Sequence, residues 1–133
     1  MLFLNESQIR ESLTMEEAID AIDSAYQLYE TKEFQMPTRM KLTDDPNALI
    51  IMPCLTDAAI GTKLVTSFPS NKQLPTLHGL VVLNSSETGE IQAIMDGSFI
   101  TGFRTGAIGG SAIRHLAPKE AKKIAIIGTG VQG

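Results

Sequence analysis

The chain has 133 residues and a formal charge of −4, with 43% apolar and 20% charged residues, which is typical of a folded globular domain and argues against wholesale disorder. The net negative charge disfavours a general nucleic-acid or anionic-membrane surface, and no apolar run approaches the roughly 20 residues that span a bilayer. The first residues turn acidic too early for a signal peptide and a single cysteine excludes an internal disulfide, so we expect a cytoplasmic protein without nucleic-acid or membrane partners.

The first predicted elements are a short strand over residues 2–4 and a brief helix over residues 6–13. A longer helix follows, because Thr14 and Glu17 have the spacing of a capping box, in which the hydroxyl and the carboxylate each satisfy a free backbone amide. Apolar residues recur behind this box at helical spacing, which predicts a helix that continues to about Thr31.

Alternating or continuous apolar runs then predict a series of strands, over residues 38–42, 48–53, 59–68, 77–84 and 90–95. Short turns separate several of these runs, and residues 85–89 are typical of a hairpin loop. Strands that follow one another this closely are most simply antiparallel. The class is therefore α+β, with a mixed, mostly antiparallel sheet packed on helices.

Residues 97–116 have a helical pattern that is interrupted by four glycines, Gly102, Gly106, Gly109 and Gly110. Each glycine inside a helix costs about 1 kcal/mol relative to alanine. We therefore expect the backbone of this helix to approach another helix, a subunit or a ligand closely.

The chain ends in an apolar run over residues 124–127 and a G-x-G-x-x-G loop. This pattern is typical of a buried parallel strand that leads into a dinucleotide-binding helix, although a lone loop of this kind is a weak signal. The chain thus reads as a first domain over residues 1–118 and the start of an incomplete Rossmann domain over residues 119–133. Without later strands to cover it, we expect the segment from about Lys119 onward to be disordered or to pair with another chain.

Three cations lie in stretches that are not typical of a solvated surface. Arg39 is on an alternating strand, Lys63 is between apolar neighbours, and Arg104 is in the glycine-containing helix. Arginine matches a carboxylate with a planar fork and lysine adds a point charge, so together they indicate a small carboxylate ligand. The alternative is that each pairs with a nearby acid or extends to water. Asp96, between a strand and a helix, is expected to cap that helix. Two distant histidines without an acidic cluster argue against a metal site.

These motifs together resemble the ornithine cyclodeaminase/mu-crystallin family over essentially all of residues 1–133. The most specific stretches are GEIQAIMDG at residues 89–97 and ITGFRTGA at residues 100–107. The GTK stretch at 61–63, the FPSN stretch at 68–71 and the GTGVQ stretch at 128–132 support the resemblance.

The resemblance implies a substrate and dimerisation domain whose sheet associates with a second copy around a two-fold axis, followed by a nicotinamide-binding Rossmann domain. It implies that Arg39, Lys63 and Arg104 surround the substrate carboxylate, with Lys63 also catalytic. By the same resemblance, the residues that approach the cofactor are Thr105, Gly106, Gly128, Gly130, Val131 and Gln132.

Members of this family move a hydride between NAD or NADP and the α-carbon of a small amino acid or imine. Ornithine cyclodeaminases convert ornithine to proline with release of ammonia, and similar members are alanine dehydrogenases or ketimine reductases. The resemblance implies NAD or NADP in the parent enzyme and none bound by this chain, since the rest of the cofactor domain lies past Gly133. The alternative is a non-catalytic dimerisation or small-molecule-binding domain.

Overall fold

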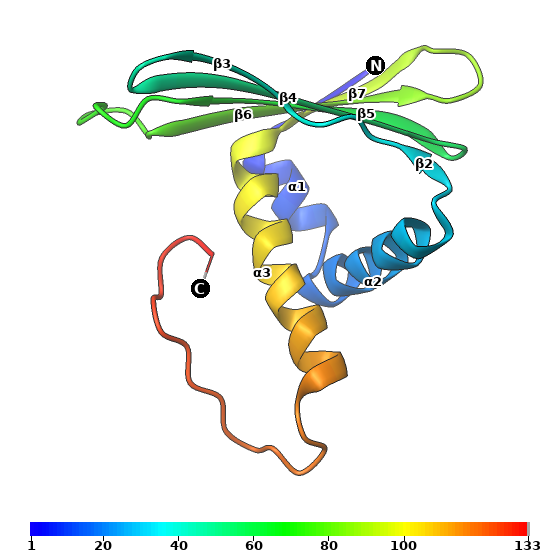
Figure 1. The fold of residues 1–133 in the computed structure, drawn as a ribbon, viewed down its shortest axis with the longest axis vertical. Helices are drawn as coiled ribbons and strands as arrows, with labels where there is room; N and C mark the ends of the chain where they lie inside the picture. The colour runs from blue at the N-terminus through cyan, green and yellow to red at the C-terminus, as the bar shows by residue number, and fades with distance from the viewer. Residues whose placement is uncertain (133) are drawn as a thin grey trace.

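The structure, a computed structural model, describes residues 1–132 and has three helices on one side of a seven-stranded sheet (Figure 1). The strands are β1 (Leu2–Leu4), β2 (Phe34–Gln35), β3 (Met40–Asp44), β4 (Asn47–Thr56), β5 (Ala59–Ser67), β6 (Leu77–Ser85) and β7 (Ile91–Asp96). The helices are α1 (Glu6–Ser12), α2 (Met15–Thr31) and α3 (Gly97–Leu116). The predicted α+β class is confirmed.

The sheet has the strand order β1-β7-β6-β5-β4-β2, and β3 pairs with β4 beside β2. All the pairs among strands β2, β3, β4, β5, β6 and β7 are antiparallel, whereas β1 runs parallel to β7. The sheet is therefore mixed and mostly antiparallel, as predicted. In the register of the central strands, Lys63 of β5 lies opposite Met52 of β4 and Val81 of β6.

Each helix begins at a capping residue that satisfies free backbone amides. Asn5 and Thr14 form capping boxes with Gln8 and Glu17, respectively. The carboxylate of Asp96 accepts hydrogen bonds from the first amides of α3, which confirms the predicted cap. These caps fix where the chain turns from strand into helix, and so fix the start of the glycine-containing helix.

Two details of the predicted strands differ from the structure. Strand β3 begins at Met40, so Arg39 lies in the connection before it and not within the strand. The two-residue strand β2 was not predicted, because two residues are too short to show a period. Its register comes from long-range pairing of Phe34 and Gln35 with Thr56 and Leu55 of β4.

Residues 124–127, which have the pattern of the first strand of a cofactor domain, form no strand in this structure. A strand needs a hydrogen-bonded neighbour, and no strand of the described chain pairs with this segment. Residues 117–132 instead leave the end of α3 and return alongside that helix (Figure 1). Val131 then lies against Gly102, so the segment contacts the rest of the chain rather than being free. Pairing with another chain stays a prediction.

The core lies between the sheet and the helices, and the opposite face of the sheet carries no helix (Figure 1). The buried apolar residues are Ile9, Ala18, Val65, Ala93 and Ala107. By strand alternation and register, exposed apolar side chains on the open face are Phe3, Met40, Leu42, Leu55, Leu64 and Leu80. We call these six residues the open-face cluster. Across residues 1–132, no helix is both long enough and apolar enough to cross a membrane.

Candidate functional site

Lys63 is at the centre of the sheet and is half-buried. Its Nζ donates a hydrogen bond to Thr101 Oγ1 of α3 at 3.4 Å. This contact places the lysine side chain on the helix-covered face of β5, away from the open-face cluster. The ammonium group of Lys63 is therefore held between the sheet and helix α3.

The electrostatic surroundings of Lys63 are positive. Burial lowers the pKa of the Lys63 ammonium, and the positive charges of Arg104 and Arg39 lower it further. Within residues 1–132, none of these three cations forms an ion pair with an acid. Neutralisation by a nearby acid therefore finds no support, whereas Arg39 and Arg104 are exposed, which fits the alternative that these two side chains extend to water. A group of unneutralised cations is suited to a bound anion.

These cations come from three separate segments. Lys63 lies on β5, Arg39 lies in the connection that leads into β3, and Arg104 lies one turn after Thr101 on α3. Residues three and four apart share a helix face, so Thr101, Arg104 and Thr105 lie on one face of α3. The Thr105 hydroxyl donates to the Thr101 carbonyl at 2.6 Å.

A different face of α3 carries the glycines, and it contacts other parts of the chain. A Cβ atom at Gly102 would lie 2.8 Å from Val131 Cγ1, and one at Gly110 would lie 2.5 Å from Ile19 Cδ1 of α2. The expected close approach is thus confirmed at these two positions. At Gly106 the nearest atoms are at ordinary contact distance, and at Gly109 nothing lies within 4 Å, so close contact does not explain those two glycines.

A cavity of about 1000 Å³ lies beside this glycine-bearing face. Its lining includes Thr101, Gly102, Gly106, Val131 and Gln132. Three of the residues predicted to approach the cofactor therefore border one space, whereas Thr105 and the three cations do not line it. Thr101 is the residue that both lines the cavity and contacts Lys63.

The glycine loop has features that fit the approach of a dinucleotide. Gly128 has a φ of 90°, which side chains rarely adopt, and neither Gly128 nor Gly130 has a neighbour within 4 Å of a would-be Cβ. The backbone at both positions is thus open to a phosphate. Residues 128–132 themselves form no helix.

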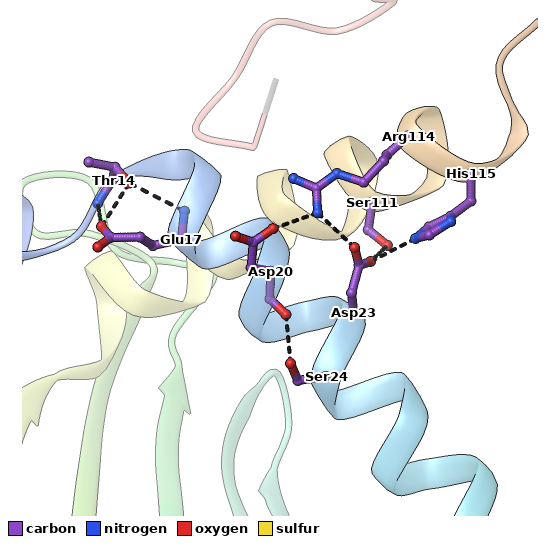
Figure 2. Close-up of polar contacts among 8 residues, drawn as sticks. All are labelled: Thr14, Glu17, Asp20, Asp23, Ser24, Ser111, Arg114 and His115. Atoms are coloured by element: carbon purple, nitrogen blue, oxygen red, sulfur yellow. Dashed lines mark hydrogen bonds and ion pairs between the residues drawn. The ribbon is translucent and has the colours of Figure 1, made fainter. Parts of the chain in front are cut away.

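A second polar cluster connects α2 to α3 (Figure 2). Asp23 accepts a hydrogen bond from the Ser111 hydroxyl at 2.5 Å and one from Arg114 Nη1 at 2.8 Å, and His115 Nε2 lies 3.2 Å away. Arg114 also donates to Asp20 at 2.6 Å. Sequence analysis missed this cluster because its members are about 90 residues apart, and it holds the two helices together away from the cations.

Thr101 was missed as well. The signal that could have found it is its place three residues before Arg104, since residues at this spacing lie on the same helix face. Within residues 1–132, no group of three or more histidine, cysteine, aspartate or glutamate side chains is arranged to hold a metal ion.

Comparisons with known proteins give a consistent answer. The sequence profile described as the ornithine cyclodeaminase/mu-crystallin family matches residues 1–133. An alanine dehydrogenase from Archaeoglobus fulgidus is 38% identical over 133 residues, which cover 98% of this chain and 41% of the relative. A Delta(1)-pyrroline-2-carboxylate reductase from Bacillus cereus is 37% identical over 138 residues, which cover 99% of this chain and 42% of that protein.

Solved structures show the same fold. An archaeal alanine dehydrogenase dimer with bound NAD has a TM-score of 0.92 at 38% identity, covering 99% of this chain and 42% of that one. The Thermococcus litoralis Delta(1)-pyrroline-2-carboxylate reductase, in complex with NADH and L-proline, has a TM-score of 0.89 at 33% identity, covering 99% and 43%. The chain thus spans about two fifths of the length of the relatives it matches.

Proposed function

Because the chain belongs to the ornithine cyclodeaminase/mu-crystallin family, we propose that it supplies the substrate-binding side of an NAD(P)-dependent enzyme that acts on a small amino acid or imine. The observation that carries this proposal is the group of three cations. Arg39, Lys63 and Arg104 come from separate segments, lie close enough to affect one another, and have no acidic partner within the described chain.

In this proposal the three cations bind the carboxylate of the substrate. The planar guanidinium groups of Arg39 and Arg104 suit a carboxylate, and the ammonium of Lys63 adds a compact charge. The lowered pKa of Lys63 suits the amine to a second role, because the neutral form of the amine can accept a proton from the substrate nitrogen. Lys63 is therefore the proposed catalytic residue.

The cofactor would occupy the cavity that Thr101 lines, next to the cations that bind the substrate carboxylate. Gly106, Val131 and Gln132 line the cavity there, and Gly128 and Gly130 offer an open backbone for phosphate, while Thr105 lies outside the cavity lining. NAD or NADP, when bound, supplies a hydride acceptor or donor at the α-carbon of the substrate. The side chains of this chain would hold that carbon in place through its carboxylate.

The relatives favour one reaction class. Alanine dehydrogenase and Delta(1)-pyrroline-2-carboxylate reductase are both named for oxidation or reduction at the carbon that bears the nitrogen. We therefore favour an amino-acid dehydrogenase or cyclic-imine reductase over an ornithine cyclodeaminase, which must also close a ring through the side-chain amine and return the hydride. A cytoplasmic homodimer is part of the same proposal, supported by the exposed open-face cluster and by the dimeric alanine dehydrogenase relative.

The test is carboxylate binding by this chain. L-alanine or L-proline is titrated into isotope-labelled protein, and we expect backbone amide shifts to concentrate at Lys63, Thr101 and Arg104. Replacing Lys63→Met should weaken binding by roughly tenfold or more, since it removes a charge-assisted contact. The matched control is Lys119→Met, which removes an exposed lysine beyond α3 and should leave binding unchanged.

Binding should also depend on pH in one direction. The folded-state pKa of Lys63 is lowered, so the ammonium charge is lost as pH rises through that value, before the roughly 10.4 of an unperturbed lysine. Affinity for the carboxylate should fall over that interval in the wild type and stay level in Lys63→Met. Shifts spread over the whole surface, with equal affinity in the two lysine variants, would refute the proposed site.

A non-catalytic carboxylate-binding domain is the second candidate. It is favoured by the location of Arg39, Lys63 and Arg104, which do not line the cavity that a cofactor would occupy. The two candidates separate in a melting experiment, because a ligand that binds only the folded state raises the melting temperature. A rise at millimolar NAD would favour the enzymatic reading for this chain, whereas a rise with L-proline alone would favour simple binding.

A further inference from the structure

Thr101 has a hydrogen-bond arrangement that sets it apart from other residues of α3. Its hydroxyl donates to the Gly97 carbonyl at 2.5 Å, one turn earlier in the helix. The same oxygen accepts from Lys63 Nζ at 3.4 Å. A hydroxyl has one hydrogen, and the Gly97 carbonyl takes it. The oxygen therefore presents only lone pairs to the lysine.

This arrangement has a direct consequence for the lysine amine. An acceptor with no hydrogen to donate can interact only with an N–H of Lys63, whether the amine is charged or neutral. One N–H is thereby directed at Thr101, and the remaining positions of the nitrogen are left for other partners. Thr101 thus restrains the long side chain of Lys63 before any ligand binds. Without this contact, the side chain would lose its rotamer freedom at the moment of binding.

Back-bonding to the preceding turn is by itself ordinary for a threonine in a helix. Thr105 does the same with the Thr101 carbonyl, and no hydrogen bond connects the Thr105 hydroxyl to Lys63. What distinguishes Thr101 is its location. It lines the cavity that Gly106, Val131 and Gln132 border, and it also touches the amine next to the two arginines.

We propose that Thr101 is a positioning residue that orients the Lys63 amine at the boundary between the carboxylate site and the cofactor cavity. The proposal rests on the proposed function for its ligand, but the contact that it invokes exists in the free protein. The Gly97 carbonyl fixes the rotation of the Thr101 hydroxyl, and the hydroxyl in turn fixes the amine.

The experiment compares Thr101→Val, which keeps the shape and removes the acceptor, with Thr101→Ser, which restores it. Ser24→Ala is the matched control, because the Ser24 hydroxyl also donates to a carbonyl one turn earlier, in α2, without contacting Lys63. Three quantities are measured: the titration of the Lys63 side chain by carbon NMR, the affinity for L-proline, and the melting temperature.

We expect Thr101→Val to move the Lys63 titration to lower pH, because the ammonium loses an acceptor, and to weaken L-proline binding by roughly three- to tenfold. Thr101→Ser should restore both, and Ser24→Ala should change neither. If Thr101→Val folds poorly, Thr101→Ala gives the same comparison. A change in melting temperature alone, with wild-type titration and affinity, would overturn the proposal.

The outcome separates this inference from the proposed function. A wild-type chain that does not bind L-proline or L-alanine contradicts the carboxylate site. The Lys63 titration in the free protein still decides the role of Thr101, since an unmoved titration in Thr101→Val would refute the positioning contact without any ligand present.

Discussion

Gly109 and Gly110 are adjacent in α3 and yet meet opposite surroundings. Gly109 is exposed, and a Cβ atom there would have no neighbour within 4 Å. A Cβ atom at Gly110 would come within 2.5 Å of Ile19 Cδ1 and 2.9 Å of Ile19 Cγ1. Replacing each glycine with alanine therefore separates two effects. At Gly109 the change alters helix propensity alone, and at Gly110 it also alters the packing between α2 and α3.

Gly109→Ala should stabilise the fold by about 0.5–1 kcal/mol, because alanine loses less backbone entropy than glycine in a helix. Gly110→Ala should instead destabilise it by about 1 kcal/mol, since the displacement of Ile19 outweighs the gain in propensity. Urea unfolding of the two variants measures both. Equal effects of the same sign would contradict the packing that the structure gives to Gly110.

For single residues, the sequence indicated which side chains could bind a ligand, but it did not indicate which residues those side chains contact. Lys63, Arg39 and Arg104 were predicted because charged residues in apolar or glycine-containing stretches are conspicuous. Thr101 was not predicted, since its role depends on the register that brings β5 beside α3, and a threonine in a helix is otherwise unremarkable. Pairing across 38 residues cannot be read from local spacing.

Among the elements, α2 is linked to α3 by a polar cluster centred on Asp23 (Figure 2). The pKa of the Asp23 carboxyl is lowered, above all by the hydrogen bond from the Ser111 hydroxyl, and further by Arg114 and His115. A carboxyl whose folded pKa lies below its unfolded value of roughly 3.9 stabilises the fold above that value. The stabilisation is lost as pH falls through the folded pKa.

Asp23→Asn should therefore lower the melting temperature at neutral pH and flatten its decline in acid. The variant and the wild type should converge as pH falls through the lowered folded pKa, where the wild-type carboxyl becomes protonated in the folded state as well. Glu30→Gln is the control, because Glu30 is an exposed carboxylate at the end of the same helix and has no ion pair among the described residues. Parallel curves for the wild type and Asp23→Asn would contradict this role of Asp23.

The helices and the long strands could be predicted because their sequences have a clear period and clear caps. Short turns between several of the strands were also predicted, and one of them connects β3 to β4 between Asp44 and Asn47. The run at 124–127 has the composition of a buried strand, but composition does not provide a hydrogen-bonded neighbour, and the structure leaves Ile127 fully exposed.

The whole molecule exposes more surface than a folded monomer of its size. Its accessible area is 9973 Å², whereas a monomer of 14.4 kDa is expected to expose roughly 6,800 Å². Part of the excess lies over residues 117–132, and part lies over the open-face cluster on the sheet. Exposed apolar area on one flat face is typical of a protein interface.

A second copy of the chain is the simplest cover for that face, since two-fold dimers bury the same patch on both subunits. Light scattering should then give a dimer at micromolar concentration. Leu64→Lys, at the centre of the face, would place two charges in the interface and should weaken the dimer by roughly a hundredfold or more. Leu116→Lys, at the exposed end of α3, should leave the dimer intact because that residue lies off the sheet. A wild-type monomer at that concentration, or equal dissociation in the two lysine variants, would mean that another surface joins the subunits or that none does.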